Sequence, residues 1–94
     1  MSMSNFNNAI YRSHERVQWT VIEDEATLVD LERDAYYMLN VAGSVVWGVI
    51  ARGESLDTAV SAICARFDVT RQVAFADVTA LVNRLLLEEL ICRQ

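Results

Sequence analysis

Residues 30–47, DLERDAYYMLNVAGSVVW, decide the fold, because an extended pattern gives way to a helical one within this stretch. Residues 35–39, AYYML, carry the aromatic and apolar side chains that are typical of a strand. Asn40 follows with a side-chain oxygen that can cap a helix, and apolar residues recur at helical spacing from residue 41 onward. The stretch therefore predicts a strand that leads directly into the first turn of a helix.

Two more strands are predicted before this stretch. Residues 17–22, VQWTVI, alternate apolar and polar positions, which places Val17, Trp19 and Val21 on one half-buried face. Residues 26–31, ATLVDL, alternate again, and short acidic turns separate the three segments. Because strands joined by such short turns can only pair in opposite directions, the sequence predicts a three-stranded antiparallel meander.

Three helices are predicted after the third strand. The first runs from residue 41 to about residue 52, and Gly53 stands where a helix commonly ends in the left-handed conformation. Ser55 and Thr70 are suitable N-caps for the second and third helices. The apolar residues at helical spacing are Leu56, Ala59, Val60, Ile63, Cys64 and Phe67 in the second helix, and Phe75, Val78, Val82, Leu85 and Leu86 in the third. We expect Leu90 and Ile91 of the tail to pack back onto this core. The fold class is therefore α+β, a three-stranded antiparallel sheet followed by three helices, in two layers.

The length and composition suit a single domain. The chain has 94 residues, of which 53% are hydrophobic, enough for one core. We expect residues 1–8 to form a flexible N-terminus and residues 9–94 one domain. No apolar run approaches the roughly 20 residues of a membrane span, and the first residues lack the apolar run of a signal peptide. We therefore expect a cytoplasmic protein with no membrane partner.

The charge distribution argues against a nucleic-acid partner. The net charge is −5, and the eight basic residues, all arginines, are scattered along the chain. The third helix does carry Arg71, Gln72, Asn83 and Arg84, residue types with which recognition helices read bases. Acidic residues lie on or beside the same helix, however, and would repel phosphate. We expect no nucleic-acid partner.

The sequence offers no recognisable catalytic constellation. His14 is the only histidine, and Cys64 and Cys92 lie outside any CxxC spacing, so neither a zinc site nor a disulfide is expected. No glycine-rich phosphate-binding loop occurs. We expect a protein that is not an enzyme and that carries no metal and no cofactor.

One acidic segment resembles the start of a calcium-binding loop. Asp30, Glu32 and Asp34 have the spacing of the first ligands of an EF-hand. The match then fails, because Ala35 replaces the required glycine and Val41 replaces the bidentate glutamate. The three acids are therefore interpreted as a solvated turn between strands.

An ordered set of short motifs extends over most of the chain. It comprises an extended segment with an aspartate (28–31), a tyrosine pair before Leu-Asn (36–40), Gly43, a Val-Trp step (46–47), Gly-Glu-Ser (53–55), Phe-Asp-Val (67–69), Asp77-Val78, Leu85 and Leu90-Ile91. At these spacings, residues 17–91 resemble the PqqD-like family, the small peptide-recognition domains of pathways that make ribosomal peptide natural products. Members that serve pyrroloquinoline quinone synthesis usually carry Pro-Glu-Gly-Met before Leu-Asn. Residues 33–38 here, RDAYYM, lack that proline and glycine, and the chain is more similar to the stand-alone recognition proteins of lasso-peptide clusters.

The resemblance implies a winged helix-turn-helix-like fold in which the third strand and the third helix flank a groove. In such proteins, the groove captures the leader of a precursor peptide by strand addition, and a separate leader peptidase of the same pathway cuts the leader. The implied peptide-binding residues are Asp34, Ala35, Tyr36, Tyr37 and Met38 on the strand, and Val73, Ala76, Asp77, Ala80, Leu81 and Arg84 on the helix.

The roles of these residues and the pathway stay partly open at the level of sequence. Small Ala76 and Ala80 would leave room for a bulky leader side chain. Tyr36 and Tyr37 must point to opposite faces of the strand, and the sequence does not decide which of them faces the groove. Two alternative functions also remain: a leader-binding chaperone for a radical SAM or pyrroloquinoline quinone pathway, and a small regulatory interaction protein.

Overall fold

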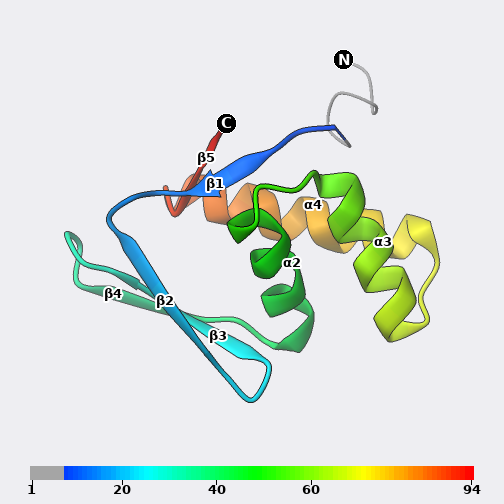
Figure 1. Cartoon of the computed structure of the whole chain (residues 1–94), viewed down its shortest axis with the longest axis horizontal. Helices are drawn as coiled ribbons and strands as arrows, with labels where there is room; N and C mark the ends of the chain where they lie inside the picture. The colour runs from blue at the N-terminus through cyan, green and yellow to red at the C-terminus, as the bar shows by residue number, and fades with distance from the viewer. Residues whose placement is uncertain (1–7) are drawn as a thin grey trace.

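The computed structural model describes residues 8–94, which form two small sheets and three helices (Figure 1). The elements in chain order are β1 (Tyr11–Ser13), β2 (Val17–Ile22), β3 (Glu25–Asp30), β4 (Ala35–Met38), α2 (Val41–Ala51), α3 (Leu56–Phe67), α4 (Arg71–Leu87) and β5 (Ile91–Arg93). The three predicted strands and three predicted helices are confirmed, and the α+β fold class with them. Of the expected flexible N-terminus, residues 1–7 lie outside the described residues.

The larger sheet is an antiparallel meander with the order β2-β3-β4. Leu28 on the central strand pairs with Trp19 of β2 and with Tyr37 of β4. Glu23 and Asp24 turn the chain between β2 and β3, and both adopt the left-handed backbone conformation, with φ of 53° and 68°. Two such residues in succession match the right-handed twist of the strands that they join. The meander therefore has two outer edges, one on β2 and one on β4.

The helix boundaries follow the capping residues that the sequence predicts. The side chains of Asn40, Ser55 and Thr70 each accept a hydrogen bond from a backbone N–H in the first turn of α2, α3 and α4, respectively. Gly53 follows α2 with φ of 74°, the left-handed conformation that favours glycine. Each cap satisfies an amide that the helix itself leaves without a partner, and so each fixes where its helix begins.

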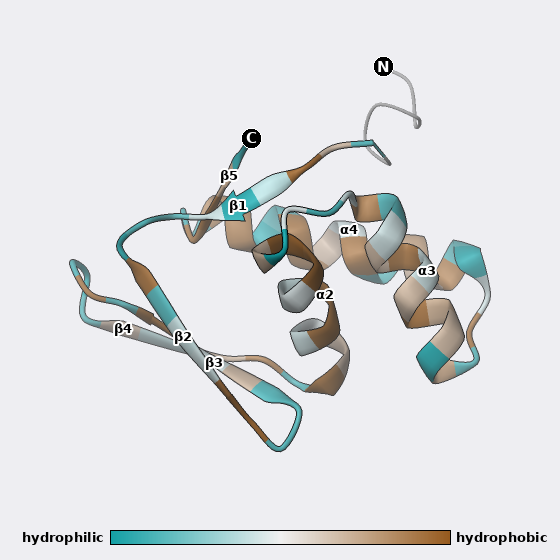
Figure 2. Cartoon of the chain, viewed as in Figure 1, coloured by the Kyte–Doolittle hydropathy of each residue, from teal (hydrophilic) through white to brown (hydrophobic). Residues whose placement is uncertain are grey.

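The core is built around α2, which contacts both the sheet and the other two helices. Figure 2 shows hydrophobic residues concentrated on this helix, in agreement with its buried residues Val46, Trp47, Val49 and Ile50. Trp47 is 1% exposed and so belongs to the core, and the ring of Trp19 on β2 meets it edge to face at 5.6 Å. Burial of this apolar surface is the main force that holds the two layers together.

Two apolar faces differ from their predictions. On β2 only Val17 is buried, whereas Trp19 and Val21 are 42% and 55% exposed, because the strand lies at the sheet's edge and extends past α2. On α4 the buried residues are Ala74, Val78, Val82 and Leu85. The helix is therefore rotated slightly from the prediction, with Phe75 at the margin of the core and Ala74 inside it.

A second sheet, which the sequence pattern did not predict, joins the two ends of the described chain. β1 pairs antiparallel with β5, and Leu90 and Ile91 are 1% and 3% exposed. The prediction that these two residues pack back onto the core is confirmed. The strand pair places the end of α4 beside the start of β2, as Figure 1 shows.

Asp30 corrects the interpretation of the acidic segment as a solvated turn. Its side chain is fully buried, and its two carboxylate oxygens accept hydrogen bonds from the Arg16 Nε at 3.1 and 3.0 Å. The backbone amides of Glu32 and Arg33 also donate to it, each at 3.2 Å. Glu32 and Asp34 are exposed, as the sequence predicts, so only the first of the three acids is structural.

The environment of Asp30 lowers its pKa. Burial alone raises the pKa of a carboxyl group, but the hydrogen bonds and positive charge of Arg16, together with the two amides, more than offset that effect. The pKa of Asp30 is therefore lower in the folded protein than its ordinary value of 3.8. The ionised carboxylate stabilises the fold above that value, and this contribution is lost as the pH falls through the folded pKa.

We predict that Asp30→Asn lowers the free energy of unfolding most strongly above about pH 4, because the variant leaves the buried Arg16 without its anionic partner. The difference between the variant and the unaltered protein should shrink as the pH falls below that value. Urea denaturation at a series of pH values measures it, with Glu32→Gln as the control at an exposed acid nearby. A difference that stays constant from pH 7 to pH 3 would contradict the structural role of the charge.

Candidate functional site

The outer edge of β4 presents main-chain groups that no other strand pairs. The amide of Leu39 donates to the carbonyl oxygen of Ala26 at 2.9 Å, which makes this a hydrogen-bonded pair of the β3–β4 ladder. Since such pairs alternate in an antiparallel ladder, Ala35 and Tyr37 also direct their N–H and C=O groups toward β3. The N–H and C=O groups of Tyr36 and Met38 therefore point to the open edge, where residues 8–94 supply them with no hydrogen-bond partner.

A hollow of about 220 Å³ lies between this edge and α4. We call it the β4–α4 hollow; it is lined by Tyr36, Tyr37, Met38, Leu39, Leu81, Arg84, Leu85, Glu88 and Leu90. Tyr37 packs against the core and donates its hydroxyl to Glu88 Oε2 at 2.9 Å, whereas Tyr36 and Met38 are 70% and 81% exposed. The structure thus settles the direction of the tyrosine pair: Tyr37 faces the helices and Tyr36 lies on the outer face.

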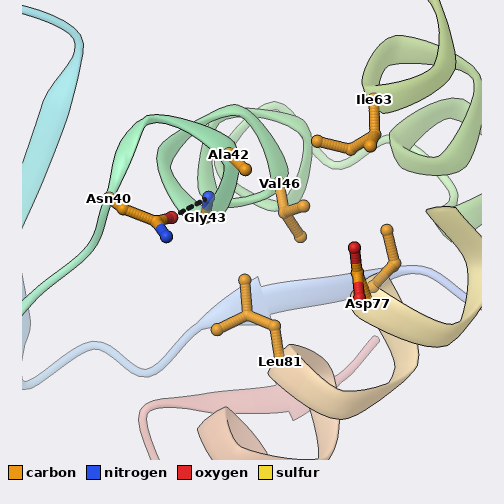
Figure 3. A pocket seen from close by; sticks show the side chains of 8 residues that line it. Asn40, Ala42, Gly43, Val46, Ile63, Asp77 and Leu81 are labelled. Carbon is orange, nitrogen blue, oxygen red and sulfur yellow. Dashed lines mark hydrogen bonds between the residues drawn. The ribbon is translucent and has the colours of Figure 1, made fainter. Parts of the chain in front are cut away.

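A second hollow, of about 360 Å³, continues from the first toward α2. This α2–α4 hollow is lined by Asn40, Ala42, Gly43, Val46, Ile63, Asp77, Val78 and Leu81, and Figure 3 shows their side chains around it. Leu81 lines both hollows, so the two are adjacent along one face of α4. Together they form what we call the groove, a surface of mixed polar and apolar character beside an open strand edge.

The width of the groove is set by contacts at the C-terminal end of α4. Arg16 donates to the carbonyl oxygen of Glu89 at 2.7 Å, and Arg33 donates to the carbonyl oxygen of Glu88 at 3.1 Å. Arg33 also pairs with the Glu89 carboxylate. With the bond from Tyr37 to Glu88, these contacts tie the end of the helix to the sheet, and we call them the clamp.

The clamp shifts the pKa values of three of its groups. The hydrogen bond to Glu88, with burial, raises the pKa of Tyr37 above its ordinary value. The ion pair between Arg33 and Glu89 raises the pKa of the guanidinium and lowers the pKa of the carboxyl. Both partners of the pair therefore stay charged over the physiological range.

The structure brings together only part of the predicted set of site residues. Tyr36, Tyr37, Met38, Leu81 and Arg84 line the β4–α4 hollow, and Asp77 lines the α2–α4 hollow. Val73, Ala76 and Ala80 are exposed on α4 and line neither hollow, and neither do Asp34 and Ala35. The groove lies closer to the core face of α4 than the helical pattern alone indicates.

Several groove residues were missed by sequence reasoning. Asn40, Ala42, Gly43 and Val46 come from the start of α2, where the prediction gave a structural role to Asn40 alone, as the helix cap. A signal was present in the sequence, because Gly43 stands inside the first turn of a predicted helix, where a glycine usually has a packing or functional reason. A Cβ atom there would lie 3.4 Å from Leu39 and 3.6 Å from Leu81. Glycine therefore keeps this side of the groove open.

The described residues also limit other kinds of site. Within residues 8–94, no three His, Cys, Asp or Glu side chains are grouped to hold a metal ion, and Cys64 and Cys92 are free thiols. No helix in this part of the chain is long and apolar enough to cross a membrane. Arg71, one candidate base-reading residue, is engaged with Asp57 at 2.6 Å.

The chain belongs to the PqqD family: the model of coenzyme PQQ synthesis protein D matches residues 25–91. The family predicted from the sequence motifs is thereby confirmed. A search of curated proteins finds no match.

Two solved structures share the whole fold. TbiB1 in complex with the TbiA(beta) leader peptide superposes with a TM-score of 0.80 at 29% identity, over 85% of this chain and 93% of that one. A lasso peptide synthetase B1 complexed with its leader peptide also superposes at 0.80, with 20% identity, over 87% of this chain and 96% of that one. The second likeness establishes the fold alone.

We predict that Tyr37 loses its proton at a higher pH than an ordinary tyrosine, because its hydroxyl donates to the Glu88 carboxylate. Absorbance at 295 nm, followed through an alkaline titration, should show a late component that disappears in Tyr37→Phe. Glu88→Gln should move this component to lower pH, and Tyr36→Phe should leave it in place. A late component that survives Tyr37→Phe would show that the clamp is not formed as described.

Proposed function

We propose that this protein is a non-catalytic recognition module that binds the leader of a ribosomally made precursor peptide and presents it to a leader peptidase in lasso-peptide biosynthesis. The observation that carries the proposal is the open edge of β4 beside a groove that combines apolar and polar side chains. The likeness to TbiB1, which is described with a bound leader peptide, supports it.

Strand addition to β4 is the binding mode that the groove favours. A peptide that extends the sheet would exchange main-chain hydrogen bonds with Tyr36 and Met38, whose amides and carbonyls face outward. Alternate side chains of the peptide would then point toward α4, because side chains alternate along a strand. The two adjacent hollows would receive these side chains, and their apolar lining would bury them.

In this proposal, presentation to a peptidase uses the same geometry. The peptide would be held at one sheet edge by a short segment, so the precursor on either side of that segment would stay accessible. The protein would then act by raising the local concentration of the cleavage site at the peptidase. In this account the groove binds the leader, and the peptidase cleaves it.

A second function rests on the family match itself. Because the matching model describes coenzyme PQQ synthesis protein D, a leader-binding role in a quinone-cofactor or radical SAM pathway is the alternative. The tyrosine-rich sequence of residues 33–38 favours the lasso-peptide pathway instead. Titration of a labelled leader from each kind of precursor, read by fluorescence anisotropy, distinguishes the two. If neither leader shows saturable binding, both candidate functions are contradicted.

We predict that Met38→Pro weakens leader binding about five- to tenfold, because it removes an outward N–H worth roughly 1 kcal/mol as a hydrogen bond and places a ring at the edge. The β3–β4 ladder should survive, since the Met38 amide does not take part in it and proline is tolerated on an edge strand. Circular dichroism and thermal unfolding verify the fold, and fluorescence anisotropy measures the affinity.

Met38→Ala is the matched control, because it removes the same side chain but keeps the N–H. Its affinity for the leader should stay well above that of Met38→Pro. Equal affinities of the two variants would assign the effect to the side chain and contradict main-chain pairing at this edge.

A further inference from the structure

Two charged side chains of the groove have no partner within the described part of the chain. Five of the eight arginines form ion pairs, with Asp30, Glu89, Glu54, Asp24 and Asp57. Arg84 is exposed, forms no such pair and lines the β4–α4 hollow. Asp77 is likewise exposed and unpaired, and it lines the α2–α4 hollow. Besides Glu88, whose carboxylate accepts from the Tyr37 hydroxyl, the described part of the groove therefore carries one unpaired negative charge in the α2–α4 hollow and one unpaired positive charge in the β4–α4 hollow.

The distance between these charges matches an extended peptide. Asp77 and Arg84 are seven residues apart on α4, close to two helical turns, so both lie on the face that borders the groove. Their separation along the helix axis is roughly 10 Å at 1.5 Å per residue. An extended peptide rises about 3.3 Å per residue, and only every second side chain points toward α4. The spacings that fit this distance best are therefore two and four residues, with the long charged side chains spanning the remainder.

The direction of an added strand follows from the sheet. Arg33, just before β4, donates to the carbonyl oxygen of Glu88 at the C-terminal end of α4, and β4 ends next to Asn40 at the α2–α4 hollow. It thus runs opposite to α4. All strand pairs here are antiparallel, and antiparallel pairing is the more stable kind, so a fourth strand would run opposite to β4. Such a peptide would run parallel to α4 and would pass Asp77 before it reaches Arg84.

Glu88 limits where a peptide carboxylate can approach Arg84. It lies four residues further along α4 in the same hollow, and its carboxylate is held by the Tyr37 hydroxyl. An acidic peptide side chain would be repelled by Glu88 and attracted by Arg84. It would therefore bind Arg84 from the side of Leu81, within the stretch between Asp77 and Arg84.

We propose that Asp77 and Arg84 set the register and direction of the bound leader, by pairing with a basic leader residue and with an acidic leader residue two or four positions after it. This inference rests on the proposed function, because it specifies the peptide that the groove accepts. The favoured ligand is an extended segment with apolar side chains toward the hollows and with the charge order basic, then acidic.

Charge reversal on both partners tests the pairing. The probe is a fluorescein-labelled synthetic peptide with the sequence of the leader encoded beside this chain. Arg84→Glu should weaken its binding by roughly fivefold or more at low ionic strength, as expected when an exposed attractive pair becomes repulsive. A peptide whose acidic residue is replaced by lysine should restore that loss for Arg84→Glu alone. Asp77→Arg should likewise weaken binding of the unaltered peptide. A peptide whose basic residue is replaced by glutamate should restore that loss for Asp77→Arg alone.

Arg12→Glu and Glu15→Arg are the matched controls, since they change the net charge equally at exposed positions outside the groove. If Arg84→Glu and Asp77→Arg bind every peptide like these controls, the pairing is wrong although leader binding stands. Tighter binding of a peptide with the two charges exchanged would overturn the proposed direction. Absence of saturable binding by the unaltered protein would instead contradict the proposed function, and this inference with it.

Discussion

The buried ion pair between Arg16 and Asp30 is the interaction on which the arrangement of the whole molecule depends. Asp30 ends β3 and is fully buried, and Arg16 precedes β2 and is 9% exposed in its side chain. The same guanidinium donates to the carbonyl oxygen of Glu89, beyond the end of α4. One arginine thus joins the sheet to the last turn of the helical layer. A buried carboxylate is tolerated only with such partners, because its desolvation is otherwise costly.

The groove is a consequence of this tie. With the end of α4 held by Arg16, Arg33 and Tyr37, the helix cannot close onto the open edge of β4 or move away from it. At the other end, the Asn40 cap and Gly43 place the first turn of α2 beside Leu81 without a side chain between them. In the proposed function, the site would therefore be formed before a peptide arrives, and less ordering would remain to oppose binding.

The sequence predicted those features that depend on local pattern. Alternation and capping residues were sufficient for the three strands and three helices, and the motif order was sufficient for the family. The burial of Asp30 was not predictable in this way, because its partner Arg16 lies in a turn with no pattern of its own. The pairing of β1 with β5 joins three-residue segments from opposite ends of the chain, which carry no periodic signal.

The candidate site was predicted only in part, because it too depends on contacts between elements that are distant in the sequence. The strand side followed from the tyrosine pair, but the helix side depended on the rotation of α4, which tertiary packing sets. Burial of Ala74 in place of Phe75 turns the helix, so Ala76 and Ala80 of the predicted set face solvent, whereas Asp77, Leu81 and Arg84 line the hollows. A helical pattern with apolar residues over a wide arc fits both rotations, and only contacts with α2 and α3 distinguish them.

Amide hydrogen exchange of β4, with and without a saturating leader peptide, is the most direct test of strand addition at this edge. The amides of Tyr36 and Met38 point outward and should exchange quickly in the free protein, whereas the Tyr37 and Leu39 amides are already bonded to β3. The account predicts that the leader slows exchange at Tyr36 and Met38. Unchanged exchange at both, or protection at the outer edge of β2 around Trp19 and Val21 instead, would contradict it.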